Sequence, residues 1–142
     1  MRALITLLGL TLGLLAPSAM ADDKDAETCI RTKIWDGYAD RWAVRSATKA
    51  LLRTGEYRVY VLTMYKGTEY RFQACGDKAA GNVDLVLHNS AGKEIKRDDT
   101  DGREPELSFR PAATDTYYIA VFLASQTDST QRAGVALATT YR

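Results

Sequence analysis

The fold is decided by residues 76–121, GDKAAGNVDLVLHNSAGKEIKRDDTDGREPELSFRPAATDTYYIAV, in which apolar runs alternate with turn residues. Two runs, residues 83–87 and 117–123, are rich in β-branched and aromatic residues, which favours buried strands. Between them, Ser90-Ala91-Gly92 and Asp101-Gly102 are typical of tight turns. The stretch therefore predicts consecutive strands joined by short connections.

Alternation of apolar and polar residues continues on both sides of this stretch. In residues 68–75, for example, Tyr70, Phe72 and Ala74 fall on one face of an extended chain. The predicted strands cover residues 56–65, 68–75, 83–87, 94–97, 107–109, 117–123 and 133–141. About seven short strands at this spacing predict an antiparallel, jelly-roll-like β-sandwich over residues 55–142, so the fold class is mainly β.

Residues 22–54 have the character of a helix packed on that sandwich. Acidic residues crowd the start of the segment, while Lys49 and Arg53 stand near its end, an arrangement that matches the helix dipole. Gly55 follows as a plausible stop. The segment is therefore predicted to form an N-terminal helical region.

An aromatic stripe runs along this predicted helix. Trp35, Tyr38 and Trp42 recur at helical spacing, and we expect the stripe to pack on the sheet. The basic residues nearby leave a membrane-surface helix as the alternative. Gly37 leaves open whether the helix is broken at its middle.

The first 21 residues have the pattern of a secretory signal. Arg2 supplies the basic start, residues 3–15 supply an apolar segment, and Ala19-Met20-Ala21 supplies a small-residue cleavage site. The apolar segment is shorter than the roughly 20 residues that a membrane helix needs. We predict cleavage after Ala21 and a periplasmic or secreted protein.

Charge and hydropathy narrow the range of partners. Without Arg2 the mature chain carries 18 basic and 18 acidic residues, so no concentrated basic surface for nucleic acid is expected. No second apolar stretch of spanning length follows, so no membrane span is expected.

Both cysteines, Cys29 and Cys75, lie in the mature chain. In an exported protein, two cysteines predict one disulfide. A redox or metal-binding thiol pair is the alternative, but there is no CxxC spacing and the one histidine, His88, is distant in sequence. We therefore predict a Cys29–Cys75 bridge between the helix and the sheet.

The acidic loop is the best candidate for a bound ion. Asp98, Asp99 and Asp101 could supply oxygen ligands for Ca²⁺. The loop does not fit the EF-hand pattern, because placing Asp99 and Asp101 at positions 3 and 5 puts Arg97 at position 1 and Ser108 at position 12. The alternative is a solvated hairpin loop whose aspartates accept hydrogen bonds from backbone N–H groups.

Catalytic chemistry has little support in the sequence. There is no G-x-S-x-G, HExxH or glycine-rich phosphate loop. His88 and Ser90 lie on or next to a strand, and we read His88 as a residue at the end of the sheet. We expect a protein that is not an enzyme; a hydrolase with a site around His88 and Asp84 is the least favoured hypothesis.

A set of core and turn motifs resembles a known family. The matching residues are Tyr70-Arg71-Phe72, Gly76-Asp77, Val83-Asp84-Leu85-Val86-Leu87, Ser90-Ala91-Gly92-Lys93-Glu94-Ile95, Asp98-Asp99-Thr100-Asp101, Leu107-Ser108-Phe109-Arg110-Pro111 and Thr116-Tyr117-Tyr118-Ile119-Ala120-Val121. The segment from 57 to 123 is similar to the bacterial pre-peptidase C-terminal domain, a jelly-roll-like β-sandwich of exported proteins. The resemblance implies an accessory role, and some domains of this type bind calcium.

The functional expectation combines these readings. It is a non-catalytic binding module of the periplasm or extracellular space that recognises protein or polysaccharide through one sheet face. Exposed tyrosines on such a face could stack on sugars or contact a protein surface. A calcium-stabilised accessory domain is the alternative.

Overall fold

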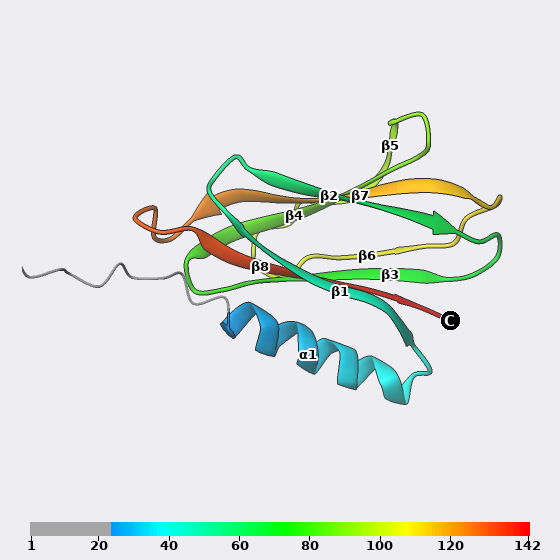
Figure 1. Ribbon diagram of the computed structural model, residues 1–142, viewed down its shortest axis with the longest axis horizontal. Coiled ribbons are helices and arrows are strands. Elements are labelled where there is room, and N and C mark those ends of the chain that lie inside the picture. The colour runs from blue at the N-terminus through cyan, green and yellow to red at the C-terminus, as the bar shows by residue number, and fades with distance from the viewer. Residues whose placement is uncertain (1–23) are drawn as a thin grey trace, which may run out of the picture.

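The structure, a computed structural model, describes residues 24–142, so the predicted signal sequence and its cleavage site lie outside the described residues. Two four-stranded sheets face each other, and one helix lies against the outside of one sheet (Figure 1). The elements are α1 (Lys24–Ala39), β1 (Ala43–Leu52), β2 (Tyr57–Met64), β3 (Tyr70–Gly76), β4 (Ala80–His88), β5 (Glu94–Asp98), β6 (Glu106–Phe109), β7 (Asp115–Gln126) and β8 (Ala133–Tyr141).

The strand order is that of a jelly roll. One sheet has the order β1-β8-β3-β6 and the other β2-β7-β4-β5. The pairs β1·β8, β2·β7, β3·β6 and β4·β5 are the antiparallel ladders of one long hairpin whose tip lies between β4 and β5. Rolling up that hairpin brings β3 beside β8 and β4 beside β7, which are the remaining ladders. The predicted fold class is confirmed, with eight strands within residues 24–142 rather than about seven.

The extra strand is β1, and the prediction of helix beyond residue 39 was wrong. The sequence of β1, AVRSATKALL, consists largely of residues that favour a helix in isolation. In the fold, the segment pairs along its whole length with β8. Tertiary pairing therefore overrides local propensity at this edge of the sandwich.

The helix ends at a Schellman motif whose left-handed position is not a glycine. The Trp42 N–H donates to the Gly37 carbonyl, and the Arg41 N–H donates to the Tyr38 carbonyl, both at 3.1 Å. Arg41 takes the left-handed conformation, with φ 64°, that the motif requires and that glycine usually supplies. The helix runs through Gly37 without a break.

The guanidinium of Arg71 lies close to Gly37. A Cβ at Gly37 would collide with Nη2 of Arg71, so any larger residue forces the arginine to move. The Cζ of Arg71 lies 4.3 Å from the centroid of the buried Trp42 ring, in cation–π contact. The end of α1 is thereby packed against β3.

The expected packing of the aromatic stripe was wrong for two of its members. Trp35 and Tyr38 are 68% and 66% exposed, and α1 instead buries Ala26 and Ile30. These two side chains meet alanines on the outer face of β8, whose small size lets the helix lie close to the sheet. Trp42 is buried, but it lies beyond the helix.

The predicted disulfide is present. Cys29 of α1 and Cys75 of β3 are bonded, with their Cα atoms 6.1 Å apart. The bond ties the helix to the outer face of the β1-β8-β3-β6 sheet, beside the cluster around Ile30. A disulfide of this kind is typical of an oxidising compartment.

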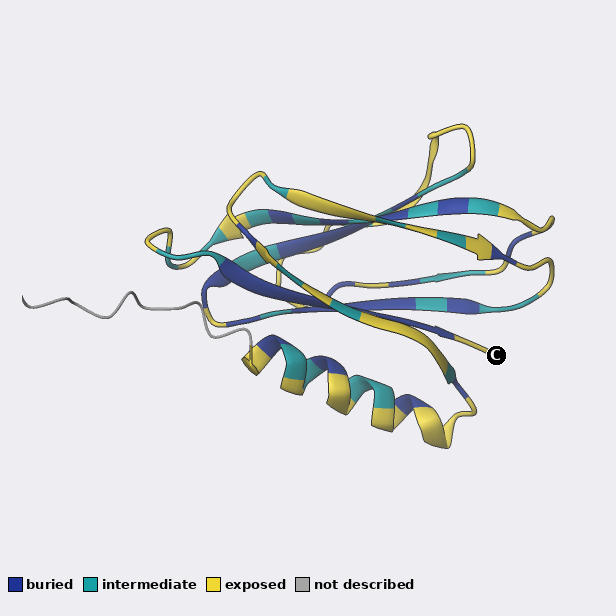
Figure 2. Ribbon diagram, in the orientation of Figure 1, coloured by how far each residue is buried: buried dark blue, intermediate teal, exposed yellow. Residues whose placement is uncertain are grey.

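The main core lies between the two sheets (Figure 2). As predicted, Tyr70, Phe72 and Ala74 share the inward face of β3, and all three are buried. Residues 133–140 of β8 are buried throughout, because one face meets the opposite sheet and the other lies under α1. Among residues 24–142, no helix combines the length and apolarity that a membrane crossing requires.

Candidate functional site

The outer face of the β2-β7-β4-β5 sheet carries no helix, whereas α1 lies against the other sheet (Figure 1). Alternate residues of β2 project outward from it. Tyr57, Val59 and Val61 are 63%, 46% and 64% exposed, although all three are large and apolar. Contiguous exposed apolar side chains of this kind mark interaction surfaces.

Strand register arranges the outward side chains in three rows across the sheet. The rows are Tyr57, Phe122 and Asp84; Val59, Ala120, Val86 and Arg97; and Val61, Tyr118, His88 and Glu94. All of these except Val61 and Tyr118 line a shallow cavity of about 420 Å³. We call this cavity the outer groove.

Asp84 is the unusual residue of the outer groove. Its side chain lies on the uncovered face, yet the residue is only 8% exposed. Its Oδ1 atom is buried without a hydrogen-bond partner among the described residues. Burial raises the pKa of Asp84, and the nearby Asp99 carboxylate raises it further, while Arg97 lowers it. The charged form is therefore disfavoured in the folded state.

Arg97 forms no ion pair with Asp84, because its guanidinium is paired with Glu94 and Asp99. Its Nε and Nη2 atoms donate to the two carboxylate oxygens of Glu94 at 2.8 and 2.7 Å. Its Nη1 atom lies 3.6 Å from Oδ2 of Asp99. The hydrogen bond from Arg97 lowers the pKa of Glu94, so that carboxylate stays charged at neutral pH. One guanidinium thus serves this region, and Asp84 is left without a hydrogen-bonded counter-ion.

The acidic loop is closed by hydrogen bonds within the protein. Oδ1 of Asp98 accepts from the Thr100 N–H and hydroxyl at 3.2 and 2.7 Å, and Oδ2 accepts from the Glu106 N–H at 2.7 Å. Although partial burial opposes the effect, these donors lower the pKa of Asp98. The loop therefore has the bonding expected of a capped turn.

The three predicted calcium ligands do not converge. Within residues 24–142, the single group of three or more His, Cys, Asp or Glu ligand atoms lying within 4.8 Å of one another is Cys29, Cys75 and Glu104, and its two sulfurs are bonded to each other. Asp99 is turned toward Arg97, and Asp101 is exposed. Calcium binding by Asp98, Asp99 and Asp101 stays a prediction that only an experiment tests.

We expect the melting temperature to be the same in millimolar calcium and in EDTA, since a ligand selective for the folded state would raise it. The reason is that both oxygens of Asp98 already accept hydrogen bonds. Differential scanning fluorimetry of the wild type checks this, with an Asp98→Asn, Asp99→Asn double variant as control. A calcium-dependent rise that the double variant lacks would restore the calcium site.

The structure brings Asp84 and His88 into the same groove but not into contact. They are four residue steps apart, which corresponds to about 13 Å along β4. The Ser90 hydroxyl donates to Asp115 at 2.7 Å rather than to His88. These residues therefore do not form the nucleophile and base that a hydrolase would need.

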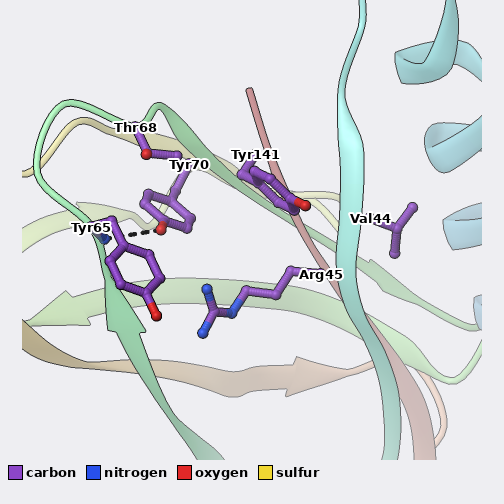
Figure 3. Close-up of a pocket in the computed structure, with 6 residues that line it drawn as sticks. All are labelled: Val44, Arg45, Tyr65, Thr68, Tyr70 and Tyr141. Atoms are coloured by element: carbon purple, nitrogen blue, oxygen red, sulfur yellow. Dashed lines mark hydrogen bonds between the residues drawn. The ribbon is translucent and has the colours of Figure 1, made fainter.

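A second concavity, of about 360 Å³, opens near the end of β8 and is lined by Val44, Arg45, Tyr65, Thr68, Tyr70 and Tyr141. Figure 3 shows the guanidinium of Arg45 reaching toward Tyr65, with Val44 turned away. The Tyr65 N–H donates to the Tyr70 hydroxyl at 3.0 Å, so the buried tyrosine is satisfied. With no carboxylate and no unpaired buried group in its lining, this pocket is a weaker candidate than the outer groove.

Comparison with solved structures identifies the fold. The pre-peptidase C-terminal domain of a collagenase from Bacillus anthracis matches 66% of this chain and 87% of its own length, with a TM-score of 0.51 and 17% identity. This chain has the fold of a pre-peptidase C-terminal domain. The resemblance seen in the sequence motifs is thereby confirmed for the fold.

A second likeness is to PliG of Aeromonas hydrophila, a periplasmic inhibitor of g-type lysozyme. The match covers 68% of this chain and 85% of the PliG chain, with a TM-score of 0.49 and 16% identity. No family model and no curated protein matches the sequence. At 17% identity, the likeness to the collagenase domain establishes the fold alone.

Proposed function

We propose that this chain is an exported, non-catalytic binding module that recognises a protein or polysaccharide through the outer groove. The observation that carries the proposal is the exposure of Tyr57, Val59 and Val61 beside the buried, unpaired Asp84 on an uncovered sheet. Exposed apolar side chains are unfavourable in water, and a bound partner would bury them. The Cys29–Cys75 disulfide supports export.

The non-catalytic part of the proposal is supported by the chemistry of the outer groove and of the pocket in Figure 3. Asp84 and His88 are too far apart along β4 to exchange a proton. The serine nearest to His88 in sequence, Ser90, is bonded to Asp115. The second cavity holds Arg45 and hydroxyl groups but no carboxylate or imidazole that could act as a base.

A charge in the centre of the outer groove tests the proposal. We expect Val59→Lys to reduce binding by at least about tenfold, because the ammonium group must be desolvated by an apolar partner surface. The measurement uses two probe panels, immobilised polysaccharides and phage-displayed random peptides, on the purified protein.

The matched control is Val44→Lys, the same substitution at a valine that is 41% exposed on β1. Both variants should melt within a few degrees of the wild type, since both sites are exposed. Loss of binding with Val44→Lys alone would move the site to the pocket of Figure 3. Failure of both panels to bind the wild type would contradict the proposal itself.

A further inference from the structure

We propose that the ligand of the outer groove is a protein that places a lysine or arginine side chain against Asp84. This inference rests on the proposed function and specifies its partner. The starting point is Asp84, a residue that is 8% exposed and whose Oδ1 atom is buried without a hydrogen-bond partner among the described residues. A buried carboxylate oxygen without a donor is costly, and a cationic group that a partner places against the carboxylate would stabilise its charge.

The charges around Asp84 favour a cation. Asp98, Asp99 and Asp101 all act on it electrostatically with the same sign, whereas Arg97 acts with the opposite sign. That guanidinium is engaged by Glu94 and Asp99. The end of the groove near Asp84 therefore carries excess negative charge that attracts basic groups and repels acidic ones.

The row that contains Asp84 fits a long basic side chain. Tyr57, Phe122 and Asp84 lie side by side on three neighbouring strands. Two strand spacings, or about 10 Å, separate the first from the last. The methylene stem of a lysine or arginine can lie along the two rings and place its charged end at the carboxylate.

The three apolar residues of the middle row favour a protein over a polysaccharide as the ligand. Val59, Ala120 and Val86 cross the centre of the groove and offer no side-chain hydrogen-bonding atoms. A sugar ring seated there would leave its hydroxyl groups desolvated without partners. Apolar side chains that flank a basic residue in a protein match both the middle row and Asp84.

The test is selection of random peptides displayed on phage against the purified full-length mature protein. We expect selected peptides to be enriched in lysine or arginine next to apolar residues. For a synthetic copy of one such peptide, Asp84→Asn should raise the Kd by at least about tenfold. Raised salt should weaken binding of the wild type as well, because the interaction is ionic. Asp36→Asn, which removes an exposed carboxylate on α1, is the matched control and should leave Kd unchanged.

A loss of binding by Asp84→Asn should not result from unfolding of the variant. Asp84→Asn removes a buried charge whose ionisation disfavours the folded state, so its melting temperature at neutral pH should equal or exceed that of the wild type. A peptide set without basic enrichment, or an unchanged Kd for Asp84→Asn, would overturn the inference. So would binding to neutral polysaccharides alone.

The Val59→Lys variant distinguishes failure of the proposed binding surface from failure of the proposed basic partner. If it abolishes peptide binding while Asp84→Asn does not, the outer groove is the binding surface and the basic partner is wrong. If neither variant changes binding, the proposed function fails together with the inference.

Discussion

Replacing Asp77 by alanine is expected to lower the free energy of unfolding by about 3 kcal/mol. The Asp77 side chain is buried at the turn between β3 and β4, with 4% of the residue exposed. Its Oδ1 atom accepts from the N–H groups of Ala79 and Ala80 at 2.9 and 3.2 Å, and its Oδ2 atom accepts from the Gly134 N–H at 2.7 Å. Alanine would leave these buried donors short of acceptors, each at a cost of about 1–3 kcal/mol.

Urea unfolding followed by circular dichroism measures the effect as a lower midpoint with an unchanged slope. Asp77→Asn should lose less, because its amide oxygen can still accept one of the hydrogen bonds. Asp101→Ala, at an exposed aspartate, should change the free energy by less than about 0.5 kcal/mol. An Asp77→Ala midpoint equal to that of the wild type would show that this turn does not hold β3 and β8 together.

Removing the disulfide is expected to cost about 4 kcal/mol in the chain-entropy model, since Cys29 and Cys75 are 46 residues apart. The double variant Cys29→Ser, Cys75→Ser should therefore melt roughly 15 °C below the oxidised wild type. Thermal unfolding with and without dithiothreitol gives the comparison. The reductant should lower the melting temperature of the wild type and leave that of the double variant unchanged.

The helix should respond before the sandwich does. Apart from the bond, α1 is held mainly through Ala26, Ile30 and their small neighbours, whereas the sheets share a much larger core. Amide hydrogen exchange of the double variant should therefore show α1 losing protection while β4 and β7 keep it. Equal melting temperatures for the double variant and the oxidised wild type would mean that the bond contributes nothing to stability.

The Gly76-Asp77 pair illustrates why loose motifs could reveal the fold. A Cβ at Gly76 would lie 2.6 Å from Cβ of Ala80 and 3.1 Å from Cγ2 of Val83, so the turn admits no side chain there without rearrangement. Asp77 then binds the start of β8 through the Gly134 N–H. The close approach at Gly76 and the Asp77 bonds to the Ala79 and Ala80 N–H groups are local requirements, and such requirements are visible in a sequence; the bond to Gly134 is not.

The missed strand shows the opposite case. Nothing in residues 43–52 distinguishes a strand from a helix, and the helix end is hidden because Arg41 adopts the left-handed conformation in place of glycine. The neighbour that makes this segment a strand is β8, and the paired residues Val44 and Thr140 are 96 positions apart in the chain. Propensity within the segment cannot report such a partner.

The sequence predicted only some of the residues and segments that form the outer groove. The outward positions of β2 and the acidic loop could be seen in the sequence, as could Asp84 and His88 as a least favoured catalytic pair. A usable signal was the apolar character of both faces of β2, where Val59 and Val61 alternate with Tyr60 and Leu62. That excess of apolar residues on an edge strand indicates a surface that a partner covers.

Alternation, turn residues, the signal pattern and the cysteine count by themselves determined a mainly β sandwich, most of its strands, and the Cys29–Cys75 bridge. These properties follow from short-range chemistry: side-chain direction along a strand and the backbone freedom of turn residues. Tertiary structure alone decided that β1 is a strand, that Tyr57, Phe122 and Asp84 form one row, and that Asp84 is buried without a partner. Each of these depends on register and packing between segments distant in the chain, and those relations exist only once the hairpin has rolled up.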